Sequence, residues 1–169
     1  MTVRLPPYKT NWFFSAMKAV LAFRPCSWFF SHTLHVFDRC VTWLSRGRQT
    51  FTELLGGAPV ITLTTIGARS GLARRAHLLG LPHGERIILI ASNYGRRSHP
   101  AWYFNLKAHP DVLITYRGQS EPYRAVEVES EEREQCWRKA VECYRGYENY
   151  RKWAGSRRIP VISLIPSSA

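Results

Sequence analysis

Two apolar, β-branched runs each end in a basic turn that contains glycine, and these two units constrain the fold more than any other part of the chain. Residues 60–65 lead into the turn at residues 67–71, and residues 86–91 lead into the turn at residues 92–97. Runs rich in Val, Ile and Thr that are bounded by glycine predict β-strands. We therefore expect two strands, each delivering a loop rich in backbone N–H and guanidinium groups.

The chain from Ala58 onward has the pattern of a small, mainly β domain with inserted helices. We predict further strands at residues 74–81, 112–117, 121–128 and 159–165, and helices at residues 101–108 and from Ser130 to Cys143 or beyond. Tight turns at residues 82–84 and 118–120 join strands into hairpins. Because strands and helices do not alternate regularly, a largely antiparallel barrel of the α+β or all-β class is expected.

An aromatic-rich segment precedes this domain, so we divide the chain into residues 1–57 and residues 58–169. The first part predicts helices at residues 12–23 and 27–44, separated at Pro25. Lys18 interrupts the first helix, which is too short for the roughly 20 apolar residues of a membrane span. Two alternatives remain for this extension: packing on the domain or on a second subunit of a homodimer, or peripheral contact with the inner face of the cell membrane.

The charge of the 169-residue chain favours an anionic partner. The formal net charge is +12 and the pI is about 10.1. A phosphorylated ligand, an acidic membrane surface and nucleic acid all fit this charge. Nucleic acid is the least favoured, since the arginines lie in glycine turns and not along one helix face. The four cysteines lack the spacing of a metal site, so we expect no bound metal. We expect their thiols to be reduced, as in the cytoplasm.

The first glycine turn is a candidate anion-binding loop. Hydroxyl, guanidinium and backbone donors gather in it, from Thr65, Gly67, Arg69, Ser70 and Gly71. Arg74 and Arg75 follow on the next strand, where alternation points them to opposite faces, so at most one faces the same pocket. The alternative is an ordinary hairpin turn with solvated arginines.

The second turn carries a similar donor set. It consists of Ser92, Asn93, Tyr94, Gly95, Arg96 and Arg97. Beyond it, Trp102 can stack on a flat ring, although a core tryptophan fits the sequence equally well. His99 can titrate near neutral pH, but a surface position explains it as well.

Three tyrosines, Tyr144, Tyr147 and Tyr150, recur every three residues and fall within one helical stripe. They either pack in the core or line the mouth of a pocket that holds a flat substrate. Gly146 disfavours a helix interior, so we expect a kink or a new helix there. Paired carboxylates and a nucleophile elbow are absent from the sequence. A redox reaction, in which a cofactor carries the chemistry, fits better than hydrolysis.

At these residues the chain resembles the deazaflavin-dependent nitroreductase family of the flavin and deazaflavin oxidoreductases. The resemblance covers residues 58–166. It rests on residues 63–71, on Ala91 and Ser92 with Gly95, on residues 100–106, and on the three tyrosines before residues 158–160. It implies a split β-barrel like that of FMN-binding reductases, coenzyme F420 as cofactor, and hydride transfer from reduced deazaflavin to a quinone, a nitroaromatic or a similar flat acceptor.

The resemblance also implies residue roles. Arg69, Ser70 and Arg74 contact the phosphate and carboxylate tail of the cofactor, and Ser92 lies beside the ring. Trp102 and Asn105 hold the cofactor. Tyr144, Tyr147 and Tyr150 line the acceptor side.

Two positions depart from the family pattern. Ala68 and Asn93 stand where many relatives carry basic residues. Arg96 and Arg97 are candidates to replace the missing charge. The wider superfamily includes FMN, haem and fatty-acid binders, so FMN is a second cofactor candidate. A non-catalytic binder of lipid, haem or another apolar ligand at a membrane surface is the alternative function.

Overall fold

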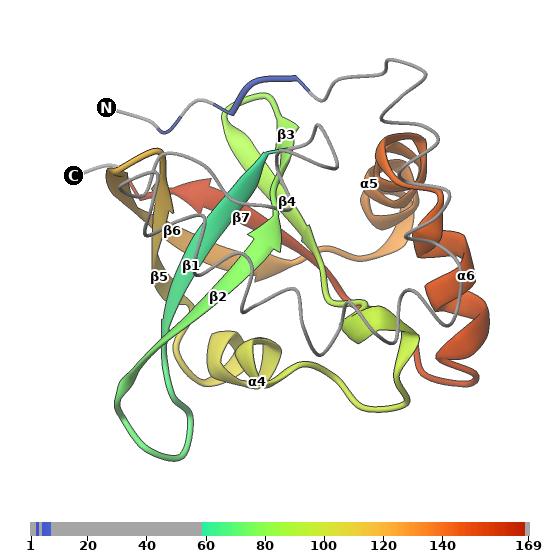
Figure 1. The fold of residues 1–169 in the computed structure, drawn as a ribbon, viewed down its shortest axis with the longest axis horizontal. Coiled ribbons are helices and arrows are strands. Elements are labelled where there is room, and N and C mark those ends of the chain that lie inside the picture. The colour runs from blue at the N-terminus through green and yellow to red at the C-terminus, as the bar shows by residue number, and fades with distance from the viewer. Residues whose placement is uncertain (1–2, 4, 8–58, 168–169) are drawn as a thin grey trace.

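The computed structural model describes Val3, residues 5–7 and residues 59–167 (Figure 1). Its centre is a single curled sheet of seven strands in the order β2-β1-β5-β6-β7-β4-β3, and all neighbouring pairs are antiparallel. The strands are β1 Val60–Ile66, β2 Ala73–Leu79, β3 Leu81–His83, β4 Arg86–Ile90, β5 Asp111–Tyr116, β6 Gln119–Glu127 and β7 Val161–Pro166. This architecture confirms the expected antiparallel barrel with inserted helices.

The two edges of the sheet are consecutive in sequence. The prediction of one strand over residues 74–81 was wrong, because Gly80 separates β2 from β3 and these strands lie at opposite edges. The Gly80 amide donates a hydrogen bond to the Pro59 carbonyl, at 3.0 Å. A β-carbon at this position would lie 2.9 Å from Leu5 Cδ1 and 3.0 Å from Ile61 Cγ2. Only glycine fits where the chain crosses between the edges, and the sheet curls there.

In the described part of the chain, three helices accompany the sheet: α4 Ala101–Ala108, α5 Ser130–Cys143 and α6 Gly146–Trp153. The first two confirm the predicted helices, and α6 begins at Gly146, where a new helix was one of the two expectations. A one-turn 3₁₀ segment, η1 Asn93–Gly95, lies in the second loop. In Figure 1, α4 lies below β1 and β2, whereas α5 and α6 lie together at the far side of β3 and β4.

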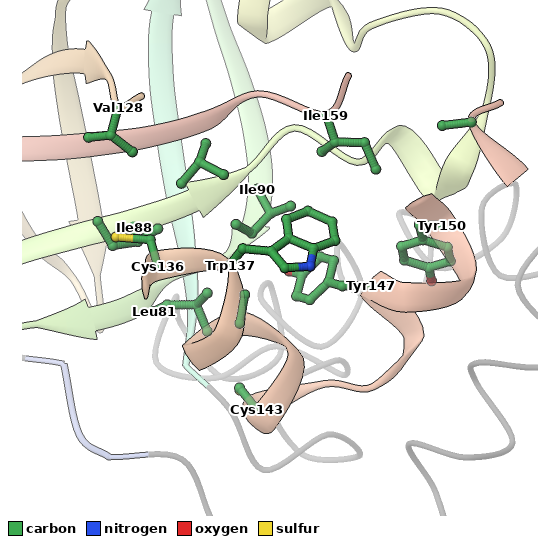
Figure 2. Packing of buried hydrophobic residues seen from close by; sticks show 13 residues of the cluster. Leu81, Ile88, Ile90, Val128, Cys136, Trp137, Cys143, Tyr147, Tyr150 and Ile159 are labelled. Atoms are coloured by element: carbon green, nitrogen blue, oxygen red, sulfur yellow. The ribbon is translucent and has the colours of Figure 1, made fainter. Parts of the chain in front are cut away.

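Two apolar clusters hold these layers together. The barrel interior is filled by residues of the strands and of α4, including Ile61, Leu63, Leu89, Leu106, Ile114, Tyr123 and Leu164. The second cluster lies between β3, β4 and β7 on one side and α5 and α6 on the other, and it includes Ile88, Ile90, Cys136, Trp137, Cys143, Tyr147 and Tyr150 (Figure 2). Cys136 and Cys143 are buried and form no disulfide.

The two predicted N-terminal helices, at residues 12–23 and 27–44, lie outside the described residues. Within the part of the chain that the structure describes, no helix is long and apolar enough to cross a membrane.

Candidate functional site

The first loop, residues 67–71, is the hairpin between β1 and β2. The Gly67 amide donates to the Leu72 carbonyl at 2.9 Å, and the Gly71 amide donates to the Gly67 carbonyl at 2.8 Å. Gly71 has φ +65°, a left-handed conformation that glycine adopts without steric cost. Arg69 and Ser70 are exposed at the tip. The loop therefore presents a guanidinium group and a hydroxyl to solvent on a closed backbone turn.

Strand register assigns the two arginines of β2 to opposite faces of the sheet, as predicted. Arg74 pairs with Thr65 and Arg75 pairs with Thr64. Thr65 is buried on the face that carries α4, so Arg74 belongs to that face. The Arg74 Cγ atom also lies 3.6 Å from the position that a β-carbon of Gly67 would occupy. Arg74, and not Arg75, accompanies the first loop.

The side chain of Asn105 ties this loop to α4. Its Oδ1 atom accepts a hydrogen bond from the Ala68 amide at 3.0 Å, and its Nδ2 atom donates to Thr65 Oγ1 at 3.0 Å. Thr65 Oγ1 in turn donates to the Arg74 carbonyl at 3.4 Å. Both side chains are buried. Thr65 and Asn105 thus shape the loop from behind, and their direct contact with a cofactor stays a prediction.

The second loop, residues 92–97, has an unusual backbone. Asn93, Tyr94 and Gly95 are consecutive left-handed residues, with φ values of 48°, 55° and 74°. The turn is closed by hydrogen bonds from the Gly95 amide to the Ser92 carbonyl and from the Arg96 amide to the Asn93 carbonyl, both at 3.0 Å. Non-glycine residues in this region cost about 1–3 kcal/mol each, so the surrounding structure must hold the loop.

Helix α6 provides part of that support. A β-carbon on Gly95 would lie 2.9 Å from Trp153 Cβ and 3.0 Å from both the Cα and the carbonyl oxygen of Tyr150. The backbone of the second loop therefore lies directly on α6, and a side chain at Gly95 would separate the two.

The tyrosines form a cluster that joins α6 to the second loop. The hydroxyls of Tyr144 and Tyr150 are hydrogen-bonded at 3.1 Å, and the ring of Tyr94 meets that of Tyr150 edge-on, with centroids 6.1 Å apart. Tyr94 is 38% exposed and Tyr144 is half-buried, whereas Tyr147 and Tyr150 are buried. Tyr147 packs against Trp137 with centroids 6.2 Å apart (Figure 2). Core packing, the alternative reading of the stripe, describes Tyr147 and Tyr150, which both belong to the buried cluster under α5 and α6.

Burial keeps the phenols of Tyr144 and Tyr147 protonated. Desolvation is the largest cause that raises the pKa of Tyr144, followed by its neighbour Tyr150, and burial likewise raises the pKa of Tyr147 well above its usual value. At neutral pH the phenols of Tyr144 and Tyr147 are therefore protonated and available as hydrogen-bond donors.

The remaining predicted residues lie in the second loop and on α4. Ser92 is half-buried at the start of the second loop, and Arg96 is exposed. Trp102 is half-buried on the first turn of α4 and packs against the barrel interior. Because α4 begins just after the second loop and its Asn105 binds the first loop, this helix connects the two (Figure 1).

Sequence reasoning missed Arg157, which binds the second loop from behind. Its guanidinium donates to the carbonyls of Ala91, Ser92 and Arg96. No motif marks this residue, since it is the first of two adjacent arginines after α6. Among the described residues, no group of three His, Cys, Asp or Glu side chains could hold a metal ion.

Comparison with known proteins identifies relatives of this chain. The model of the F420H(2)-dependent quinone reductase family matches residues 37–166. A Mycobacterium tuberculosis protein described as an F420H(2)-dependent quinone reductase, Rv3178, is 34% identical over 108 residues, which are 64% of this chain and 90% of the relative. The F420H(2)-dependent quinone reductase Rv1261c of the same species is 39% identical over 59 residues, 35% of this chain and 40% of the relative.

The solved structures that match include two that share both fold and sequence with this protein. An F420-H2 dependent reductase, FDR-A, superposes with a TM-score of 0.58 at 38% identity and covers 63% of this chain and 93% of its own. A protein described as a domain-swapped dimer superposes with a TM-score of 0.60 at 33% identity, covering 83% of this chain and 98% of its own.

These matches confirm the resemblance drawn from the two loops, α4 and the tyrosines. They also confirm the split-barrel fold, the oxidoreductase class and coenzyme F420 as the cofactor. The chain belongs to the F420H(2)-dependent quinone reductase family.

Proposed function

We propose that this protein reduces quinones with F420H2 held between the two loops. The first loop with Arg74 binds the anionic tail, the second loop and Trp102 bind the ring, and the tyrosine cluster lies on the acceptor side. The observation that carries the proposal is the connection through α4. One helix begins shortly after the second loop and hydrogen-bonds to the first loop through Asn105, so α4 holds the two loops to one another.

The side chains at the first loop fit a phosphate and a carboxylate. Arg69 and Ser70 are exposed, and Arg74 lies on the same side of the sheet as the loop. Guanidinium groups bind such oxyanions through paired hydrogen bonds, and a hydroxyl adds a further donor. This donor set replaces the basic side chain that is missing at position 68. Arg75 is not part of the set, because it belongs to the opposite face of the sheet.

The residues at the second loop fit a flat ring and a proton transfer. Bound F420H2 supplies a hydride, and reduction of a quinone to a hydroquinone also requires a proton. Ser92 is half-buried and Tyr94 is partly exposed in this loop, and Trp102 follows on the first turn of α4. We assign the proton to the Tyr144 hydroxyl, which burial keeps protonated and which is hydrogen-bonded to the Tyr150 hydroxyl at 3.1 Å; water returns the proton to Tyr144 after the transfer.

Cofactor binding tests the proposal first. The purified protein is titrated with oxidised F420 and, separately, with FMN, while the fluorescence of the ligand is followed. Saturable micromolar binding of F420 without binding of FMN, followed by oxidation of F420H2 by a soluble quinone, supports the proposed function. Binding of neither cofactor, with lipid copurifying, would favour the non-catalytic lipid binder in its place.

The two arginines of β2 provide a matched test of the tail-binding loop. We expect Arg69→Ala and Arg74→Ala each to weaken F420 binding about ten- to hundredfold, the loss typical of one hydrogen-bonded charge pair. Arg75→Ala removes the same charge from the opposite face and should leave F420 binding near the wild-type value. Equal losses in Arg74→Ala and Arg75→Ala would mean that only the overall charge of β2 matters.

We also propose that two copies of the chain associate. Strand register assigns four exposed apolar side chains to one face of the sheet, Ile66, Leu113, Val126 and Ile165. This face is a suitable surface for a second copy, and the relative described as a domain-swapped dimer supports association. Light scattering on wild type and Leu113→Glu tests it, since a monomeric wild type would refute the dimer. Membrane contact stays a prediction that depends on residues 12–44, outside the described part of the chain.

A further inference from the structure

Arg157 lies four residues beyond the end of α6, and its guanidinium spans both ends of the second loop. Nη1 donates to the Ala91 carbonyl at 3.2 Å, and Nη2 donates to the Ser92 carbonyl at 2.6 Å. Nε donates to the Arg96 carbonyl at 2.9 Å. The left-handed residues 93–95 lie between these acceptors. A single side chain therefore closes this loop, in which three consecutive residues have left-handed backbone conformations.

The geometry requires arginine in particular. The three acceptors are satisfied by three different nitrogens of one planar group. A lysine ammonium carries its donors on a single nitrogen and cannot span the same acceptors. The Nη1 atom also lies 3.4 Å from His99 Nδ1. Arg157 is half-buried, so these hydrogen bonds are partly shielded from water.

A second contact makes the loop and α6 one unit. Gly95 lies against the backbone of Tyr150 and Cβ of Trp153, on the helix that carries Tyr147 and Tyr150. Arg157 follows the same helix and binds the same loop. The second loop is thus held at Gly95 by the helix and at both ends by the arginine, and it cannot shift relative to Tyr150 unless one of these contacts breaks.

We propose that Arg157 is a positioning residue for hydride transfer: it holds the second loop and the tyrosine helix in one fixed arrangement, so that the cofactor ring and the acceptor keep the distance the reaction needs. This inference rests on the proposed function. The role of Arg157 is indirect, since it acts through the carbonyls of Ala91, Ser92 and Arg96. Small errors in the relative placement of two reactants reduce the rate strongly, which is why a remote clamp matters.

The first test uses the protein without cofactor. Hydrogen exchange is followed at the Gly95 and Arg96 amides, whose hydrogen bonds close the turn. In Arg157→Lys we expect these two amides to exchange at least about tenfold faster, while the amides of β1 and β5 keep their wild-type rates. Arg158→Ala, which removes the exposed neighbouring arginine, should match wild type at every amide. Unchanged exchange at Gly95 and Arg96 in Arg157→Lys would overturn the inference whether or not F420 binds.

The second test uses the loaded enzyme. If Arg157 positions the loop, Arg157→Lys lowers kcat for the quinone about tenfold or more and leaves the KM for the quinone near its wild-type value, since the loss is in alignment and not in acceptor affinity. In Arg157→Ala, added guanidinium at a non-denaturing concentration should restore both kcat and slow exchange at Gly95, whereas methylammonium at the same ionic strength should not. An equal loss in every parameter with no rescue would mean that Arg157 only stabilises the fold.

The outcomes separate this inference from the proposed function. Wild-type protein that binds F420 and reduces quinone, with an Arg157→Lys variant identical to it, refutes the positioning role and leaves the function intact. Wild-type protein that does not bind F420 refutes the function, and the exchange experiment still decides whether Arg157 clamps the loop.

Discussion

The side-chain amide of Asn105 donates a hydrogen bond to Thr65 Oγ1 at 3.0 Å, and it joins α4 to the end of β1. The other half of the same amide accepts from the Ala68 amide in the first loop. Both residues are buried, so this small network replaces water in holding the loop against the helix.

Removal of this amide should loosen the first loop. We expect Asn105→Ala to lower the free energy of unfolding by about 1–3 kcal/mol, because Thr65 Oγ1 and the Ala68 amide lose their partner. F420 affinity should fall as well, because the turn that carries Arg69 and Ser70 then becomes mobile. Urea unfolding and F420 titration measure the two effects. Thr65→Val keeps the Ala68 hydrogen bond and should lose less affinity, so an equal loss in both variants would contradict this account.

Gly95 and Gly84 form a matched pair for testing close packing of the second loop on α6. Both have positive φ, +74° and +63°, so alanine strains the backbone similarly at either position. Only at Gly95 does an added β-carbon meet atoms of α6, at 2.9–3.0 Å, whereas nothing lies within 4 Å at Gly84. We expect Gly84→Ala to cost about 1 kcal/mol of stability and Gly95→Ala clearly more, with loss of F420 binding only in the latter. Urea unfolding of both variants checks this, and equal costs would argue against the packing.

Gly146→Ala should displace one tyrosine without unfolding the protein. A β-carbon there would lie 2.2 Å from Tyr144 Cζ and 2.4 Å from its hydroxyl, so the ring must move away and the hydrogen bond to Tyr150 breaks. Alanine is the better helix former, which offsets part of the cost. We expect quinone turnover to fall while F420 affinity and the melting temperature change little. Tyr144→Phe keeps the ring in place and tests the hydroxyl alone, and wild-type turnover in both variants would exclude Tyr144 as the proton donor.

His99 should make the protein less stable in acid. Burial first, and then the neighbouring Arg157, lower the pKa of His99 below its usual 6.5, while Glu127 opposes the shift. Because the unfolded chain binds the proton more tightly, the stability contributed by neutral His99 is complete above pH 6.5 and is lost as the pH falls from 6.5 through the folded pKa. NMR titration of the imidazole measures that pKa directly. In Arg157→Gln it should rise toward 6.5, and a pKa that stays unchanged would show that Arg157 does not act on His99.

Most of the elements could be predicted because their signals are local. The β-branched runs of β1 and β4, the hairpin of β5 and β6, and the bounds of α4 all follow from periodicity and turn residues within a few positions. The prediction of one strand over residues 74–81 was wrong because it, too, relied on local signals alone. Its composition favours one continuous strand, and only the approach of Leu5 and Ile61 to Gly80 shows why the chain leaves one sheet edge for the other.

By itself the sequence determined which chemical groups are available and on which short segments they lie: arginines and glycines in two loops, an aromatic helix start, and tyrosines at helical spacing. The tertiary structure decided which of these groups meet. Asn105 binds an amide 37 positions away, and Arg157 binds carbonyls 61 to 66 positions away. It also decided that Tyr147 packs against Trp137 while Tyr94 joins Tyr150. Hydrogen bonds and packing between distant segments depend on how the sheet curls, and no local periodicity in the chain encodes that curvature.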